Sequence, residues 1–332
     1  MEWLFLLLLL WVLFFEVVYP WGVFEVEDCP KEEREPRTEN QRSFVLHVHT
    51  QFSYDSLGKP EELEEAARRL GISRVFITDH ENDLFKEVVK PASRDLFSVG
   101  VEFQDPRYGR LLALGNGLFV VAHPNHGKKD EYRWRGNYPE NFLYELVDLK
   151  DALVRANPLV KLHLAVRFLL LYPLLGLRAL DYFPRLVPVK DWVLLYLERT
   201  GGRMPVAGGL DHHVKFSFWE KPKKSLSFPP YLWSFYLLQN RTFGDEPEEA
   251  LKRGRLYLSF CGERISLENG RVPVKGKVLT VNFFRNGGIR ANLCGRVERG
   301  AAVSVLYRYL FRVKGLFFGL RPAVLLQFPK GR

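Results

Sequence analysis

The chain has 332 residues, of which 47% are hydrophobic and 14% aromatic. Such a composition can bury a large core, and it excludes a disordered chain, a coiled coil and a disulfide-stapled mini-protein. The three cysteines, Cys29, Cys261 and Cys294, lie far apart without paired spacing. The sequence therefore predicts neither a disulfide framework nor a thiolate zinc cluster, and it leaves the redox compartment open.

Positive charge is concentrated in the last quarter of the chain. The formal net charge is +9, but residues 251–332 hold 17 Lys and Arg against 3 Asp and Glu, a net +14, so residues 1–250 carry −5. A basic region can contact anionic lipid, nucleic acid or a phosphorylated ligand. A solvated β-rich surface is the simpler interpretation, and no Arg-Gly run or zinc-finger spacing indicates nucleic acid.

The N-terminal segment is strongly apolar. Residues 3–15 carry no charge, and the apolar stretch continues to Phe24 with only Glu16 interrupting it. About 20 apolar residues can span a bilayer as a helix, whereas a cleaved signal peptide is disfavoured because no Lys or Arg precedes the run and no small-residue cleavage site follows. We predict an uncleaved membrane anchor over residues 1–24 and a polar linker over residues 25–43. The flanking charges do not fix the side of the membrane.

A different pattern begins at residue 44. Residues 44–49 are rich in strand formers, residues 60–70 begin with Pro60 and end before Gly71 as helices do, and residues 74–78 form another apolar run. This strand–helix–strand order is a βαβ unit and favours a parallel sheet. Further apolar runs of strand length occupy residues 96–103, 118–122 and 205–210.

Histidine and carboxylate residues follow each of these predicted strands. They stand in His47-Val48-His49, Thr78-Asp79-His80, Gly100-Val101-Glu102, Ala122-His123-Pro124 and Asp211-His212-His213. Catalytic groups of α/β barrels gather at the carboxyl ends of parallel strands. Any one pair alone would be better interpreted as a core histidine or a turn, but five in order favour a shared metal site.

Imidazoles and carboxylates in one pocket are the ligands of zinc, manganese or iron. Alternating side chains place both imidazoles of His47 and His49 on one side of a strand. Clustered divalent ions lower the pKa of a bridging water and stabilise the oxygens of an in-line displacement. The expected function is therefore a metal-dependent hydrolase, specifically a phosphoesterase in which a metal-bridging hydroxide attacks phosphorus in line.

Seven short motifs between residues 44 and 215 stand in a single order. They are Leu46-His47-Val48-His49-Thr50, Ser53-Tyr54-Asp55-Ser56, Pro60-Glu61-Glu62-Leu63, Ile77-Thr78-Asp79-His80, Gly100-Val101-Glu102, Ala122-His123-Pro124 and Gly208-Gly209-Leu210-Asp211-His212-His213. As a set they resemble the polymerase-and-histidinol-phosphatase (PHP) family of metal-dependent hydrolases. The resemblance implies an α/β fold, a distorted (β/α)₇ barrel over residues 44–255, with two or three metal ions (Zn, Mn or Fe).

The resemblance also implies roles for individual residues. The ligands would be His47, His49, Glu102 and Asp211 for one metal, Glu102 and His123 for a second, and Asp55, His80 and His213 for a third. Asp55 or His213 could lie near the leaving group. Glu145 and Asp148, in a stretch shared with some membrane-associated members, would do structural work.

Arg110 departs from the family pattern. It stands where the family normally supplies another histidine, and arginine cannot ligate a metal because it stays protonated. Two explanations are open: His126 substitutes if its loop bends back, or the site holds two metals and Arg110 grips a substrate phosphate in bidentate fashion. Lys128 and Lys129 are further candidate grips, although a solvated loop is the simpler interpretation.

Residues 125–204 are predicted to be a helical insertion in the barrel. Within it, residues 159–177 are very apolar, but their longest uncharged run is ten residues, which is too short to span a membrane. This segment is either part of a helical pair that covers the barrel or an interfacial helix on the same membrane as the anchor.

The remaining chain should close the barrel and add a second domain. Residues 229–241 and 247–257 have helical patterns, and residues 256–332 are predicted to be a small basic β-rich domain. That domain resembles one that trails some extracytoplasmic PHP members, including relatives of the carbamate-cleaving branch.

Two other functions are compatible with the same site. Metal-bound hydroxide also attacks carbonyl carbon, so an ester, amide or carbamate hydrolase is the first alternative. A membrane-tethered, non-catalytic metal-binding barrel is the second, and Arg110 is its main support. The expected partners are a small-molecule phosphoester or ester and a membrane, with no nucleic acid, and the catalytic domain is expected on the extracytoplasmic side.

Overall fold

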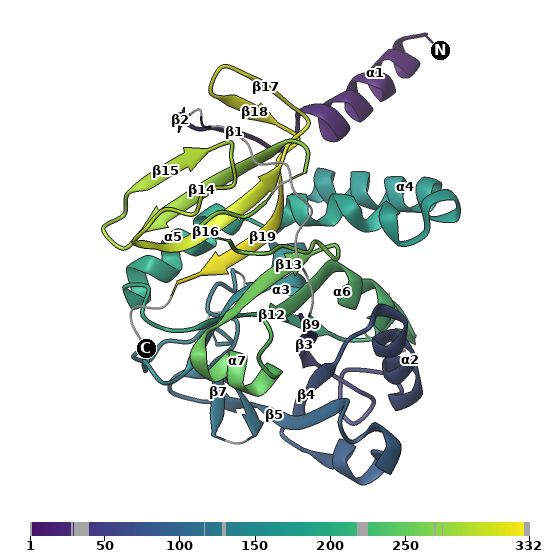
Figure 1. Ribbon diagram of the computed structural model, residues 1–332. Coiled ribbons are helices and arrows are strands. Elements are labelled where there is room, and N and C mark those ends of the chain that lie inside the picture. The colour runs from purple at the N-terminus through teal and green to yellow at the C-terminus, as the bar shows by residue number, and fades with distance from the viewer. Residues whose placement is uncertain are drawn as a thin grey trace.

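The computed structural model describes residues 2–27, 29, 40–115, 117–127, 131–217, 225–268, 270–273 and 275–328. Its centre is a closed barrel of seven strands (Figure 1). They are β3 (Ser43–Val48), β4 (Arg74–His80), β5 (Phe97–Asp105), β6 (Gly109–Gly115), β7 (Leu118–Val121), β8 (Leu143–Asp148) and β9 (Val206–His212). Strand β9 pairs with β3 and closes the ring, which confirms the predicted barrel.

The barrel is distorted at one strand. Strand β6 is antiparallel to both β5 and β7, whereas the other five pairings in the ring are parallel. Antiparallel neighbours need only short turns and no crossover helix, and in the described residues no helix separates β5, β6 and β7. The carboxyl ends of the parallel strands therefore meet at one end of the barrel.

Helices follow several barrel strands. Helix α2 (Pro60–Leu70) begins at a proline, ends at Gly71 in the left-handed conformation (φ 65°), and buries Leu63, Ala66 and Ala67. Two 3₁₀ turns, η2 (Leu84–Val88) and η3 (Pro91–Ser93), connect β4 to β5. After β8 come α3 (Leu149–Arg155), α4 (Pro158–Leu175), the 3₁₀ segment η4 (Gly176–Leu186) and α5 (Val189–Thr200).

The predicted helical insertion of residues 125–204 is wrong for residues 143–148, because these form barrel strand β8. All six residues of β8 are buried. Two of them, Glu145 and Asp148, are carboxylates, and this interrupts the apolar pattern by which a buried strand is recognised. The helical part therefore begins at Leu149.

The segment after β9 mixes helices and strands. It contains β10 (Phe216–Ser217), β11 (Ser225–Leu226), α6 (Tyr231–Leu237), β12 (Leu238–Thr242), α7 (Pro247–Arg253) and β13 (Leu256–Phe260). The helix predicted over residues 229–241 is wrong beyond Leu237, because β12 pairs antiparallel with β3 and with β13. Residues 256–257, at the end of the second predicted helix, likewise begin β13. Pairing between distant strands overrides the local helical pattern here.

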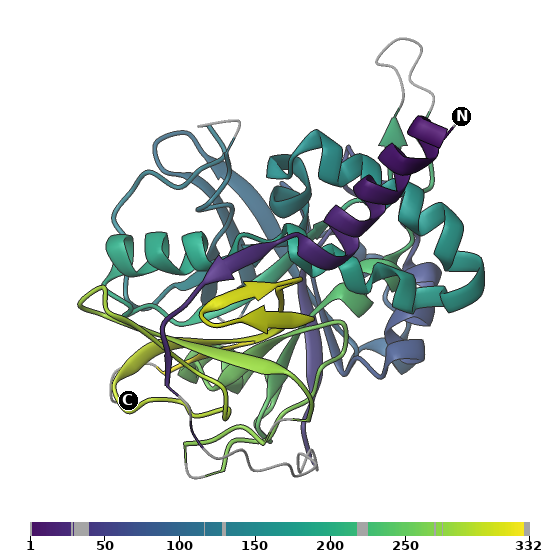
Figure 2. The same cartoon turned by 90° about the horizontal axis from the view of Figure 1, so that it is seen from above.

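The C-terminal strands extend the barrel sheet. Through β13 the sheet continues into β19 (Arg321–Gln327), β16 (Ala301–Arg308), β14 (Val278–Phe284) and β15 (Ile289–Asn292). The predicted linker begins as strand β2 (Val26–Glu27), which pairs parallel with β15. A separate three-stranded sheet joins β1 (Trp21–Val23), β18 (Leu316–Phe318) and β17 (Phe311–Val313). The strands β1 and β2, which follow α1 in the chain, thus pair with C-terminal strands, while α1 itself projects away from them (Figure 2).

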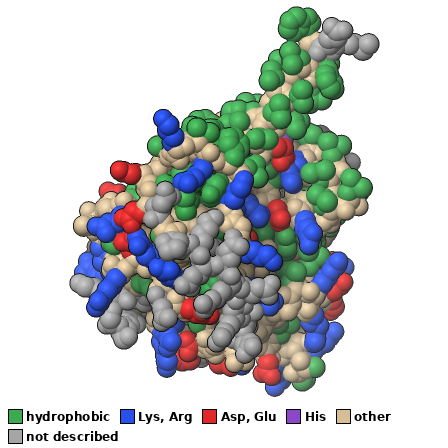
Figure 3. Space-filling model, turned by 45° about the horizontal axis from the view of Figure 1, so that its top comes forward, with side chains coloured by type: hydrophobic (Ala, Val, Ile, Leu, Met, Phe, Trp, Pro, Cys, Tyr) green, Lys and Arg blue, Asp and Glu red, His purple; other side chains and the backbone are tan. Residues whose placement is uncertain are grey.

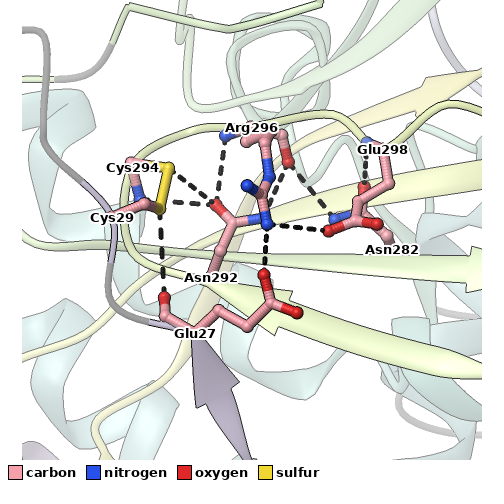
Figure 4. Close-up of a disulfide and its surroundings, with 7 residues drawn as sticks. All are labelled: Glu27, Cys29, Asn282, Asn292, Cys294, Arg296 and Glu298. Atoms are coloured by element: carbon pink, nitrogen blue, oxygen red, sulfur yellow. Dashed lines mark hydrogen bonds and ion pairs between the residues drawn. A yellow bond between two sulfur atoms is a disulfide. The ribbon is translucent and has the colours of Figure 1, made fainter.

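A disulfide joins Cys29 to Cys294, with their Cα atoms 5.7 Å apart (Figure 4). The sequence analysis missed it because 265 residues separate the two cysteines, and linear spacing carries no information on such a pairing. The bond lies where β2 meets the end of β15, beside an ion pair between Glu27 and Arg296. The side-chain oxygen of Asn292 accepts hydrogen bonds from the backbone amides of Cys294 and Arg296.

Two apolar helices project from the same side of the molecule (Figures 1 and 2). One is α1 (Glu2–Leu13), which continues as the π-helical turn η1 (Phe14–Val18). The other is α4 with η4, and this stretch, Pro158–Leu186, is long and apolar enough to cross a membrane by length and composition alone. Residues Trp3–Val18 form a shorter apolar helix, of the kind found in membrane anchors and in signal sequences.

Candidate metal centre

The backbone is irregular at the end of β3, where His47 and the following His49 are both fully buried. The pairings of β3 with β4 and with β9 shift register on either side of His47, and His47 has a φ of 62°. His123 and Asp211 also have positive φ, at 49° and 43°. Each such backbone conformation costs on the order of 1–3 kcal/mol in a non-glycine residue and occurs mainly at functional sites.

Four buried side chains meet at the centre of this end of the barrel. The Nε2 atom of His49 lies 3.3 Å from Glu102 Oε2 and 3.3 Å from Asp211 Oδ1. The Nε2 atom of His47 lies 3.5 Å and 3.6 Å from the same two oxygens. One ligand atom from each of these four residues lies within 4.8 Å of all the others, so one cation could contact all four.

A second group lies beside the first. The Oδ2 atom of Asp55 is 3.1 Å from His213 Nε2 and 3.5 Å from His80 Nε2. The ring of His49 stacks against both imidazoles, with centroids 4.1 Å from His213 and 4.5 Å from His80. The structure thus brings Asp55, His80 and His213 together at the edge of the first group.

Arg110 lies on the other side of Glu102. Its Nη1 donates to Glu102 Oε1 over 3.1 Å, and His123 Nε2 lies 3.4 Å from the same oxygen. The guanidinium is also held by Gln104 and by the ring of Tyr132, whose centroid is 4.0 Å away. Arg110 therefore occupies the position at which Glu102 and His123 are predicted to bind the second metal ion.

His126 does not face Glu102, but with His123 and Asp151 it forms another group whose ligand atoms lie within 4.8 Å of one another and could hold a cation. The Nδ1 atom of His126 forms a hydrogen bond with Asp151, and Asp151 also lies 3.3 Å from His123 Nδ1. His126 is thereby directed to Asp151 rather than to Glu102. Lys128 and Lys129 lie outside the described residues.

Nine buried ligand-type atoms have no hydrogen-bond partner among the described residues. They are Nε2 of His47, His49, His80, His123 and His213, Oδ1 of Asp55 and Asp211, Oε2 of Glu102 and Oδ2 of Asp148. An unsatisfied buried polar atom costs about 1–3 kcal/mol, and native proteins rarely leave more than a few. Their concentration around Glu102 fits a site that binds divalent cations.

Glu145 fixes the orientation of His47. Its Oε1 lies 2.6 Å from His47 Nδ1, and its Oε2 accepts from the backbone amide of His123. A carboxylate on Nδ1 keeps the proton there and leaves Nε2 free for a metal. Gly209 makes room for this contact, because a Cβ there would lie 1.7 Å from Glu145 Oε1. Glu145 thus does the structural work that the family resemblance implies.

Other supporting contacts come from residues to which the sequence alone assigns no role. Ser53 Oγ lies 3.1 Å from His49 Nδ1 and accepts from the amide of His80. Lys150 Nζ lies 2.8 Å from Asp211 Oδ2. Asp79 accepts from the backbone amide and the hydroxyl of Thr50.

His212 points away from the centre. Its Nε2 contacts the carbonyl of Pro229, and its ring packs against Tyr231. Burial, reinforced by the neighbouring His213, lowers the pKa of His212 to about 3, so this imidazole is neutral. Strand alternation therefore directs Asp211 and His213 to the site and His212 to the core.

The electrostatics of the site favour a bound cation. Burial alone would raise the pKa of the Glu102 carboxyl, but the imidazoles of His47, His123 and His49 hold that pKa well below its usual range. Burial would lower the pKa of His47, but Glu145, Glu102 and Asp211 raise it well above its usual value. Without a metal, these carboxylates favour the protonated form of His47, whereas burial lowers the pKa of His49 to about 4. A divalent cation would displace the proton of His47.

Comparison with known families gives one match. Residues 46–148 match the family model of the PHP domain. The match confirms the predicted resemblance, and it contains every predicted ligand except Asp211 and His213. With the clustered ligands it supports a metal-dependent hydrolase.

Comparisons with solved structures and with curated proteins do not narrow the function further. A solved structure, a two-domain protein containing a predicted PHP-like metal-dependent phosphoesterase from Bacteroides vulgatus ATCC 8482, is 13% identical, covers 91% of this chain and 100% of its own, and gives a TM-score of 0.37. No curated protein matches the chain.

Proposed function

We propose that this protein is a metal-dependent phosphoesterase whose site is the carboxyl end of the barrel. The observation that carries the proposal is the group of nine unpartnered buried atoms around Glu102. Bound divalent ions (Zn, Mn or Fe) would lower the pKa of a water molecule and stabilise the oxygens of a phosphoester. The chain's own contribution is to hold the imidazoles in place through Glu145 and Ser53.

We further propose that the site holds two metal ions and that Arg110 replaces a third. Its guanidinium and His123 share Glu102 Oε1, and a divalent cation at that oxygen would be repelled by a group that stays positively charged. The two ions would be held by His47, His49, Glu102 and Asp211, and by Asp55, His80 and His213. Arg110 makes no described hydrogen bond through Nη2, which could therefore bind a phosphate oxygen of the substrate.

The test begins with the metal content of the purified full-length protein. The wild type should hold about two equivalents of metal per chain, and the His47→Ala/His49→Ala double variant less than about one, because imidazole and carboxylate ligands act together. The Arg110→His variant should gain an equivalent. Less than one equivalent in the wild type, unaltered by the double change and not restored by manganese or zinc, would contradict the proposal.

The metal-loaded protein is then compared on two substrate panels. Phosphomonoesters and phosphodiesters should be hydrolysed, and the His47→Ala/His49→Ala variant should be inactive on both. Turnover of aryl esters or carbamates alone would instead favour the carbonyl-directed hydrolase on the same site. Metal bound without any turnover would favour the non-catalytic barrel.

We also propose that residues 1–24 remain attached as a membrane anchor. Phe15 is buried against Val160 and Tyr182, and Arg185 donates to the carbonyls of Phe15, Glu16 and Tyr19. Strand β1 follows immediately and pairs with β18. Cleavage in this region would remove packed parts of the domain, which disfavours a signal peptide.

The disulfide supports an extracytoplasmic position for the catalytic domain, because such bonds persist mainly in oxidising compartments. The test is thiol alkylation in cells that express the full chain. Cys29 and Cys294 should be protected from alkylation until a reductant is added. Full alkylation without a reductant would contradict this placement.

A further inference from the structure

We propose that a second, apolar surface around the base of α1 rests on an anionic phospholipid membrane and sets the orientation of the barrel. The inference rests on the proposed anchor and goes beyond it. An anchor alone leaves the domain free to rotate, whereas a docked surface does not. The surface has two parts, the outer face of the sheet β1–β18–β17 and the outer stripe of α4.

The outer face of the small sheet is entirely apolar. Trp21 pairs with Phe318 and Val23 with Leu316, and these two partners pair in turn with Phe311 and Val313 of β17. Residues directly opposite each other share a face of the sheet, so all six side chains lie on one side. Trp21, Val23 and Val313 are 55%, 73% and 59% exposed. The opposite face buries Phe317 in the core.

Helix α4 carries a second exposed apolar stripe. Its outward residues are Leu159, Leu162, Val166, Leu169, Leu170 and Leu174, of which Leu174 is 79% exposed. The spacing of three or four residues places them on one face of the helix. The inward face is attached to the domain, because Phe168 and Tyr172 pack on Trp233. The attachment favours a helix that lies along the membrane surface over one that crosses the bilayer.

Both parts adjoin α1, and this continuity argues for a common membrane. The ring of Phe14 lies 6.3 Å from that of Trp21, while Phe15 packs with Val160 of α4. Figure 3 shows apolar side chains over the projecting helix and around its base. A helix that is apolar on all sides is not stable in water, so the lipid that covers α1 would also meet the sheet and α4.

The charge beside this surface is complementary to anionic lipid. A cavity of about 390 Å³ is lined by Arg185, Lys277, Arg308 and Arg321 together with residues 309, 310 and 319. The cavity adjoins the end of η1, because the amide of Gly319 donates to the carbonyl of Val18. Arg308 and Arg321 pair with Glu263 and Asp181. Lys277 donates to the carbonyl of Leu310 and Arg185 to the carbonyls of the anchor, and neither forms an ion pair with a carboxylate among the described residues. Juxtamembrane cations of this kind are attracted to acidic headgroups.

The test uses the full chain in phosphatidylcholine vesicles that contain phosphatidylglycerol. An environment-sensitive fluorophore is placed on Val313→Cys or Leu170→Cys. Leu84→Cys serves as the matched control, because Leu84 lies on the barrel and is 54% exposed, close to the exposure of Val313. An interfacial element lies about 5–10 Å into the headgroup boundary, so labels at 313 and 170 should shift to the blue and be quenched by lipids with nitroxide-labelled chains. The label at 84 should not change.

Quenching at 313 and 170 no stronger than at 84 would overturn the proposal. Cross-linking of those same positions between two chains would assign the surface to a second copy instead. Equal quenching in vesicles of phosphatidylcholine alone would overturn the requirement for anionic lipid. Flotation of the protein with the vesicles tests the anchor separately, so a failure of α1 and a failure of the surface are distinguishable.

Discussion

Two buried clusters of histidine and carboxylate lie in this molecule, one at the barrel end and one at the base of α1. At the base of α1, His163 accepts from Trp11 Nε1 through Nδ1 and contacts Glu16 through Nε2. Arg167 also pairs with Glu16, 2.8 Å away. Both ring nitrogens of His163 are satisfied, whereas His47 and His49 each have one that is not.

This difference in hydrogen bonding distinguishes a candidate metal site from a structural contact that uses the same residue types. A histidine whose two ring nitrogens are both bonded holds two elements together and has no free nitrogen for a ligand. An unsatisfied one carries an energetic cost that a ligand can remove. The barrel cluster is therefore a candidate binding site, and the cluster at His163 connects the anchor to the domain. Four predictions test this contrast.

The largest expected effect separates the two clusters directly. His47→Ala/His49→Ala should lower the metal content to less than about one equivalent per chain and abolish activity. His163→Ala should leave the metal content unchanged and lower the free energy of unfolding by about 1–3 kcal/mol, because Glu16 and Trp11 lose their buried partner. Metal analysis and denaturant unfolding of both variants measure this. Metal loss in the His163→Ala variant would remove the distinction.

The disulfide should contribute to stability and not to the site. Cys29→Ser should lower the free energy of unfolding by about 2–5 kcal/mol, because it releases a long constrained loop in the unfolded chain. Thermal unfolding with and without a reductant measures the effect, and Cys261→Ser is the control. Metal content should be unaffected, and a reductant should not change the Tm of the Cys29→Ser variant.

Glu145→Gln tests the positioning of His47. The amide has one acceptor oxygen and cannot accept from both His47 Nδ1 and the backbone amide of His123, as the carboxylate does. Metal affinity should therefore fall about 10–100-fold while the ligands remain. Competition with a metal chelator gives the affinity. A Gln239→Glu change, which alters a buried polar residue of β12, serves to show that the loss is specific to the site.

The smallest effect is expected at the anchor joint. Glu16→Gln keeps the hydrogen bond to His163 and removes the charge facing Arg167, which should cost about 1 kcal/mol or less because the carboxylate is partly exposed. Protease susceptibility near residue 20 and unfolding free energy report it. An effect on catalysis would indicate that anchor and barrel end are coupled.

The features that could be predicted from the sequence depend on residues that are close together in the chain. Seven of the eight predicted ligands stand within strands or within two residues of a strand end, and Asp55 lies in the loop after β3. Strand alternation explains why Asp211 and His213 face the site and His212 does not. Glu145 was harder to place because its role depends on Gly209 of a neighbouring strand. Pairings between distant segments, β12 with β3 and Cys29 with Cys294, leave no trace in spacing or periodicity. They arise only when the sheet is assembled.

The long sequence separation of the two disulfide cysteines also determines when their bond can form during synthesis. Cys29 is made 265 residues before its partner, and at 5–20 residues per second it waits roughly 13–53 s for Cys294 to be synthesised. During that interval Cys261 is the first other thiol available to it. In the finished fold, burial raises the pKa of the Cys261 thiol well above its usual value, which makes it a poor nucleophile. A bond formed between Cys29 and Cys261 during synthesis would therefore have to be exchanged for the Cys29–Cys294 bond before Cys261 is buried next to β13.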